Sequence, residues 1–214
     1  MISFRATKSY STTGLLVRIV LAIWFVVIFL LAANGEFFRP PEAPPFPFLI
    51  GATLPLIVFI AAYAGLRDFR EMVLAADLRL LTAIQGWRAG GLGFLALYTY
   101  GLLPALFAWP AGLGDIAIGL TAPWIMLALI RRPSFATSRS FVVWNLLGIL
   151  DLVVAVSLGA LSGGFFFPGL VTVTTAPMSQ LPMVLIPAYF VPLFIMLHLT
   201  ALFQSREQSS SMSS

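Results

Sequence analysis

Long apolar runs separated by short polar segments make up most of the chain. A hydrocarbon core about 30 Å thick requires roughly 20 apolar residues for a helix to cross it. Six runs meet this requirement, at about 15–33, 48–66, 81–103, 112–130, 140–162 and 182–203. The pattern predicts an all-α membrane protein, with a single six-transmembrane-helix domain over residues 1–203. The serine-rich residues 204–214 are expected to form a disordered tail.

The basic residues lie almost entirely on one side of this predicted bundle. Ten of the 12 Lys and Arg residues fall there: Arg5, Lys8, Arg18, Arg67, Arg70, Arg79, Arg131, Arg132, Arg139 and Arg206. The opposite side has only Arg39. Because cytoplasmic loops carry the excess of Lys and Arg, we expect the N-terminus, the C-terminus and the tail to be cytoplasmic. The expected location is the inner membrane of the cell, as a multi-pass protein.

Three connecting segments have distinct patterns. Residues 37–48 are rich in proline and phenylalanine, which predicts a stiff polyproline-like outer loop. Residues 67–80 place their apolar side chains on one helical face, which predicts a short helix at the cytoplasmic interface. Residues 163–181 are long, uncharged and aromatic at Phe165, Phe166 and Phe167. This segment is expected either to dip back into the membrane or to lie flat on it.

Composition agrees with a membrane protein and excludes several other classes. Hydrophobic residues make up 60% of the chain and charged residues 9%, with a mean hydropathy of +0.99, whereas a soluble domain carries about 25% charged residues. The net charge of +4 comes from the short loops, so the expected partner is the lipid bilayer and not a nucleic acid. With no cysteine and one lysine, Lys8, thiolate metal sites and a buried Schiff-base lysine are excluded. We expect no metal and no cofactor, since no phosphate-binding loop, zinc motif or flavin fingerprint occurs.

The candidate functional residues are the polar side chains inside the predicted spans. A charged group at mid-bilayer costs roughly 2.5–3.5 kcal/mol on insertion scales, so it usually faces a partner or a cavity. Six residues qualify as candidates for a substrate or ion path: Arg88 and Gln85 in the third span, Asp115 in the fourth, Asn145 and Asp151 in the fifth, and His198 in the sixth.

Arg88 and Asp151 are predicted to form an ion pair between the third and fifth spans. At 1.5 Å per residue, Arg88 lies about 13 Å and Asp151 about 18 Å from the cytoplasmic side, a difference that an arginine side chain bridges. Small and polar residues share a face with each of them, and membrane helices approach closely along such stripes. Two roles stay open for this pair: a structural lock between two helices, or part of a substrate or proton path.

His198 is expected to be a packed or interfacial histidine, at a depth close to that of Gln85 and Asn145. A lone histidine cannot build a metal site, and its neighbours on the same helical face are mostly apolar. Pro187 and Pro192 are predicted to kink the sixth span and to free backbone carbonyls beside it.

The residues Gly112-Leu113-Gly114-Asp115 resemble the Gly-x-Gly-Asp signature of intramembrane aspartyl proteases. In that family a second membrane aspartate completes a dyad that shares a proton to activate water. The resemblance implies that Asp151 is that second aspartate, and the segment 104–106 is similar to the Pro-Ala-Leu element of the presenilin branch. In this chain both elements stand in the reverse order from the family.

A second interpretation of Asp115 follows from the predicted span boundaries. If the fourth helix begins near residue 112, Asp115 lies in its first turn, some 5 Å below the outer surface. There its carboxylate complements the helix dipole and caps free amides. On this interpretation Asp151 lies too deep to share a proton with Asp115.

Three classes of function remain open. The favoured one is a small transporter or channel-like protein with a polar interior around Arg88 and Asp151, expected to work as a homo-oligomer or with a membrane partner because six helices are few for a permease. The second is an accessory or scaffold subunit, and the third is an intramembrane aspartyl protease. We favour a protein that is not an enzyme. The chain as a whole resembles small polytopic proteins of bacterial inner membranes, a resemblance that implies no particular activity.

Overall fold

The computed structural model describes residues 3–38, 40, 43–166 and 172–213. Within these ranges the ordered elements are all helices. Five helices are long and apolar enough to cross a membrane, as in a multi-pass membrane protein. Their spans are Thr12–Ala33, Phe46–Gly65, Ala105–Arg131, Arg139–Leu161 and Ile186–Ser211. They correspond to helices α1 (Ser3–Ala33), α2 (Phe46–Gly65), α6 (Ala105–Arg131), α7 (Arg139–Leu161) and α8 (Val191–Ser213), the last preceded by a π-helical turn, η4 (Ile186–Phe190).

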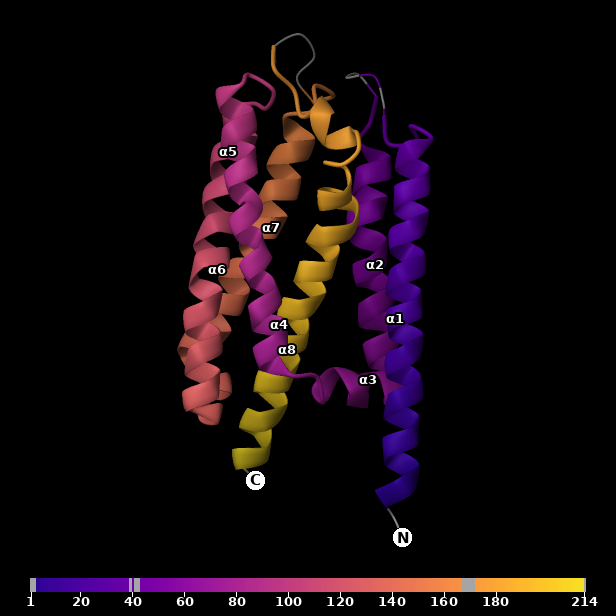
Figure 1. The fold of residues 1–214 in the computed structure, drawn as a ribbon, viewed down its shortest axis with the longest axis vertical. Coiled ribbons are helices and arrows are strands. Elements are labelled where there is room, and N and C mark those ends of the chain that lie inside the picture. Colours follow the sequence, from indigo (N-terminus) through magenta and orange to yellow (C-terminus); the bar gives the residue numbers. More distant parts are fainter. Residues whose placement is uncertain (1–2, 39, 41–42, 167–171, 214) are drawn as a thin grey trace.

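The third predicted span is divided into three short elements. They are α4 (Leu78–Ile84), the 3-10 helix η1 (Gln85–Gly91) and α5 (Leu92–Thr99), which follow one another without a break. Figure 1 shows α4 and α5 in one column beside α6. No single helix in this column reaches the length of a bilayer crossing, so the six apolar runs of the sequence give five long helices. A 3-10 segment in the middle of a helix commonly marks a functional hinge or a strained site.

Local sequence signals explain where several of these helices begin. Ser138 precedes α7, and its hydroxyl accepts a hydrogen bond of 3.2 Å from the backbone N–H of Phe141. Asp77 precedes α4 and accepts from the N–H of Arg79 at 2.8 Å. Pro104 precedes α6 in an extended conformation, a position where proline needs no hydrogen-bond donor.

The structure corrects the predicted boundaries of the fourth span and of the tail. Helix α6 begins at Ala105, not near residue 112, so that Gly112 and Gly114 lie inside it. Helix α8 continues to Ser213, so the segment expected to be disordered is helical to that residue. Part of the reason is that the side chain of Gln204 is buried and donates to the backbone carbonyls of Val73 and Ala76, at the end of the short helix that follows α2.

The three connecting segments agree only in part with their predicted forms. Residues 67–80 form a shorter helix than expected, α3 (Arg67–Leu74), which lies across one end of the bundle (Figure 1). In the segment 37–48, helix α2 already begins at Phe46, while the predicted loop positions 39 and 41–42 lie outside the described residues. In the segment 163–181 the 3-10 helix η3 (Ala176–Ser179) is present, and the positions 167–171, including Phe167, lie outside the described residues.

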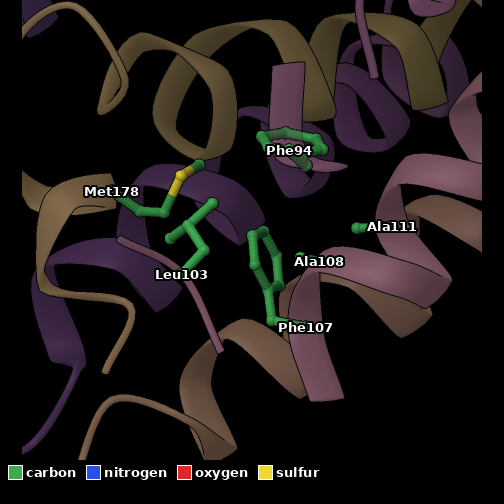
Figure 2. Close-up of a cluster of buried hydrophobic side chains, with 6 residues drawn as sticks. All are labelled: Phe94, Leu103, Phe107, Ala108, Ala111 and Met178. Carbon is green, nitrogen blue, oxygen red and sulfur yellow. The ribbon is translucent and has the colours of Figure 1, made fainter. Parts of the chain in front are cut away.

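The described chain begins and ends at the same end of the bundle (Figure 1). We call this the terminus end; it also holds α3 and the 3-10 helix η2 (Pro133–Thr137). The opposite end, the far end, holds the described residues of the segments 34–45, 100–104 and 162–185. An apolar cluster between α5, α6 and η3 forms the core near the far end, as Figure 2 shows: Phe94, Leu103, Phe107, Ala108, Ala111 and Met178.

Candidate functional site

Arg88 lies at the centre of the bundle, and each nitrogen of its guanidinium has a partner. Its side chain is 1% exposed. Nε donates to Asp115 Oδ1 at 2.7 Å, and Nη2 forms an ion pair with Asp151 Oδ2. Nη1 donates to the backbone carbonyl of Gly148 at 3.2 Å and to His198 Nε2 at 3.1 Å. Four contacts to α6, α7 and α8 therefore fix one side chain of η1.

The predicted ion pair between Arg88 and Asp151 is present, and the predicted placement of Asp115 is wrong. Because α6 begins at Ala105, Asp115 lies ten residues into the helix, at a depth of about 15 Å. Asp151 lies ten residues before α7 ends at Leu161, also about 15 Å deep from the far end. The two carboxylates are therefore level, and both reach the same guanidinium.

Two glycines of α6 make this close approach possible. A Cβ atom added at Gly114 would collide with the carboxylate of Asp151. A Cβ at Gly119 would collide with the backbone nitrogen of Ala89, next to Arg88 in η1. Contacts of this kind are typical of membrane helices that pack through small residues. Gly114 and Gly119 are therefore the surface of α6 against which α7 and η1 pack.

His198 belongs to the same network through both ring nitrogens. Arginine has no acceptor, so Nε2 must be the unprotonated nitrogen that accepts from Arg88. The proton then sits on Nδ1, which donates to Asn145 Oδ1 at 2.9 Å, and Asn145 Nδ2 donates to the carbonyl of Phe141 at 2.8 Å. The histidine is thus a neutral imidazole, packed edge-on to Trp144 at 5.4 Å between ring centroids. Its expected depth beside Asn145 is confirmed.

Gln85 is buried one turn from Arg88 and contacts a different helix. Its Nε2 donates to the carbonyl of Phe194 in α8 at 3.3 Å. Its Oε1 has no hydrogen-bond partner within the part of the chain that the structure describes. Five of the six sequence-derived candidates therefore meet in one polar network, which we define as Arg88, Asp115, Asp151, Asn145 and His198. Gln85 lies beside it.

The formal charge of the polar network is −1, because one arginine faces two aspartates and the imidazole is neutral. The two carboxylate side chains are 14% and 13% exposed, against 1% for the arginine. Among the described residues, no group of three or more His, Asp or Glu side chains is arranged to hold a metal ion. Arg88 binds the two carboxylates through separate nitrogens, Nε and Nη2, whereas the two carboxyl groups of a protease dyad share one proton with each other.

Two hollows in the structure are relevant to the site. A cavity of about 210 Å³ lies near the far end, between α2, α5, α6, α7 and the segment before α8. A wider groove of about 1920 Å³ runs along α1 and α2. None of the six candidate residues lines either hollow. The polar network is thus packed between helices and not spread over an open channel.

A family profile described as "Domain of unknown function (DUF8737)" matches residues 45–205. The chain belongs to this family. No curated protein and no solved structure matches the chain. The DUF8737 region begins just before α2 and ends within α8, so it contains the whole polar network and leaves out α1. In the structure α1 and α2 are the least buried of the five long spans, each with 6% of its most apolar window buried.

Sequence reasoning named all five members of the polar network of this DUF8737 protein as candidates, but it placed Asp115 too close to the outer surface. The sequence places Asp115 in a first helical turn because the fourth apolar run is predicted to begin near residue 112. Pro104 was the available signal for an earlier start, since proline favours the position before or at the first turn of a helix. Moving the start to Ala105 places Asp115 at the depth of Asp151 without further information.

Proposed function

We propose that this protein is a small membrane transporter in which the polar network is the proton-binding site that drives transport. The observation that supports the proposal is the charge count of the site. One carboxylate is enough to neutralise a buried arginine, and Arg88 has two, Asp115 and Asp151. A surplus negative charge in the membrane interior is costly unless a cation or a proton balances it. A site with one surplus negative charge takes up and releases one positive charge.

A proton fits the geometry better than a metal cation. The guanidinium already binds both carboxylates, so a metal ion would have to displace it from them. Protonation of one aspartate requires no such displacement and leaves the other as an ionised partner of Arg88. The arginine therefore stays paired in both states, and the change of charge is carried by a carboxyl group that is slightly exposed.

The experiment measures protonation directly, by infrared difference spectroscopy on the full chain in lipid bilayers. We expect a protonated-carboxyl band to appear reversibly on acidification and to be lost in Asp115→Asn or Asp151→Asn. Glu36→Gln, at the far end of α1, is the control variant and should keep the band. A spectrum in which both network aspartates stay ionised over the whole range of pH that the folded protein tolerates would exclude a proton-binding role.

The proposed topology has six spans in the inner membrane, with both termini in the cytoplasm. In this proposal the column α4–η1–α5 crosses the membrane as the third span, in addition to the five long helices. The ten basic residues of the loops and ends support the orientation. Since the chain has no cysteine, single cysteines can be placed at will. We expect Tyr100→Cys to react with an impermeant maleimide in intact cells, and Ser210→Cys to react only after permeabilisation. The reverse result would overturn the orientation.

A scaffold or accessory subunit is the second candidate, and one observation favours it: the polar network is packed and lines neither hollow. In this case the network would only hold α6, α7, α8 and η1 together. The near-isosteric Asp151→Asn separates the two functions. A scaffold should show no proton uptake at the network and should still co-purify with its membrane partner when Asp151 is replaced by Asn.

A further inference from the structure

The geometry points to the far-end cavity of about 210 Å³ as a binding site for a small, uncharged, largely apolar molecule that carries one hydrogen-bond donor. Its described lining residues come from α2, α5, α6, α7, η3 and η4, and from described positions of the loops before α2 and after α7. The residues that line the cavity support the binding of such a molecule. Its role as the substrate site of the transporter rests on the proposed function.

Aromatic pairs form the walls of the cavity. Phe94 of α5 and Phe107 of α6 meet edge to face, with ring centroids 5.3 Å apart. Phe37 and Phe48 form a second pair, 5.8 Å apart, on the side of α2. Figure 2 shows Phe94, Phe107 and Met178 converging within the apolar cluster. Preformed aromatic walls are typical of pockets that bind rings.

The polar groups of the cavity determine what kind of ligand it accepts. The described residues that line it are apolar or uncharged, and walls of this kind favour a neutral ligand, because an ionic ligand is costly to desolvate. Thr175 Oγ1 donates to the carbonyl of Gly159 at 2.7 Å, and Ser179 Oγ donates to the carbonyl of Ala176 at 2.6 Å. Each hydroxyl proton is therefore engaged, and the free capacity of both oxygens is to accept. A ligand N–H or O–H group is the complement.

The volume sets the size of the ligand. An apolar cavity of about 150 Å³ in another protein is large enough to hold benzene. A space of about 210 Å³ accordingly fits a molecule of one or two fused rings. Phenols and indoles have this size, an apolar ring and a single donor.

Two helical faces connect the cavity to the polar network. On α7, Asp151, Ala155 and Gly159 are spaced four residues apart, and the last two line the cavity. On α6, Phe107 and Asp115 lie eight residues apart on one face, and Phe107 lines the cavity. One helical turn, about 5.4 Å, separates the cavity wall at Ala155 from the carboxylate of Asp151.

The last span changes from a π-helical turn to an α-helix beside the cavity. The π-helical turn η4 begins at Ile186, and Ile186 and Pro187 both line the cavity. Turns of this type are frequent at functional sites, because the local backbone is wider and leaves carbonyls without regular partners. The cavity therefore touches the irregular part of the helix that also carries His198 of the polar network.

The test uses 5-fluoroindole and the full chain in lipid nanodiscs, with ¹⁹F NMR to separate bound from bilayer-dissolved probe. We expect saturable binding to the natural chain. Ala155→Leu fills the cavity and should weaken binding by about tenfold or more, as overpacking by several methyl groups does. The matched control is Ala117→Leu, an exposed position of α6, which should bind as the natural chain does. Signals no different from those of empty nanodiscs, or equal binding by both variants, would overturn the proposal.

A second variant tests the same binding site even if Ala155→Leu misfolds. Thr175→Val leaves the volume nearly unchanged and removes one acceptor. It should reduce the preference for indole over 1-methylindole, which has no donor, while the affinity for 1-methylindole stays within about twofold. An unchanged preference in this variant would contradict the assigned role of the Thr175 hydroxyl.

The pH dependence of probe binding distinguishes the proposed ligand site from the proposed proton site. If the cavity is the substrate site of a proton-driven transporter, the affinity for the probe should change with pH in the natural chain and not in Asp151→Asn. Saturable binding that is independent of pH would retain the ligand site and count against the coupling. Absence of binding together with a protonated-carboxyl band would overturn the ligand site and leave the proton site standing.

Discussion

Replacing Arg88 by Met should destabilise the protein more than any change to one of its acidic partners. Methionine keeps much of the volume and the apolar stem but removes the charge and all donors. Asp115 and Asp151 would then face each other as buried anions without a cation, and His198 Nε2 would lose its donor. Removal of one partner from a buried ion pair costs about 3–5 kcal/mol, so we expect a loss at the upper end of that range.

The single acid variants should cost less because Arg88 keeps a second partner. Asp151→Asn exchanges one charge-assisted hydrogen bond for a neutral one, and the guanidinium remains paired with Asp115 at 2.7 Å. We expect a loss of about 1–2 kcal/mol for this change. The double variant Arg88→Met with Asp151→Asn should be rescued only partly, since Asp115 stays charged. The triple variant that also carries Asp115→Asn should recover most of the lost stability.

Unfolding free energies measured by circular dichroism in mixed micelles, with increasing sodium dodecyl sulfate, test this order. Arg131→Met, at the exposed end of α6, is the control and should change the free energy of unfolding by less than about 1 kcal/mol. The reasoning is refuted if Arg88→Met is as mild as Arg131→Met. It is also refuted if the triple variant loses the sum of the three single losses.

Two further substitutions test the packing around the polar network and the end of α8. Gly148→Ala would drive a Cβ atom into the His198 ring and should destabilise the protein by about 2–4 kcal/mol. The control, Gly93→Ala, meets open space and should be neutral or stabilising by up to about 1 kcal/mol. Equal effects of the two variants in thermal unfolding would contradict the close contact at Gly148. Gln204→Leu removes the donor to the carbonyls of Val73 and Ala76, both at 2.9 Å, and should destabilise by about 1–3 kcal/mol. Gln208→Leu, exposed one turn later, serves as its control, and a loss as large as that of Gln204→Leu would show that α3 is not held in this way.

The polar interior could be predicted because its energetics are strong and depend on few residues. Arg88 and Asp151 lie in apolar runs where an unpaired charge is costly, and their depths could be counted from flanking arginines. The same reasoning failed for Asp115, whose depth depends on where a helix starts. Glycine has a low helix propensity in water, but in membrane helices it is common at close contacts. Gly112 and Gly114 accordingly lie inside α6, where they pack against Leu95 and Asp151.

Two other features depend on tertiary contacts that a single sequence does not display. The 3-10 segment Gln85–Gly91 lies inside an apolar run that predicts one continuous helix, and its tighter form accompanies the contact of the Ala89 backbone with Gly119. The residues after Phe203 are polar enough to be disordered alone. They are helical because Gln204 and Ser205 are buried, and Gln204 bonds to the end of α3. In each case a contact distant in sequence overrides local preference.

The glycines and the polar network depend on one another, and this bears on how the site works. A guanidinium reaches partners on three helices only if their backbones approach more closely than ordinary side chains permit. Gly114, Gly119 and Gly148 provide that approach, each directly against a member of the network or the backbone beside it. Such close contacts leave little room for the arginine to move. A change of charge at Asp115 or Asp151 therefore cannot be absorbed by a swing of Arg88, and any structural response has to involve displacement of α6, α7 or η1 as units.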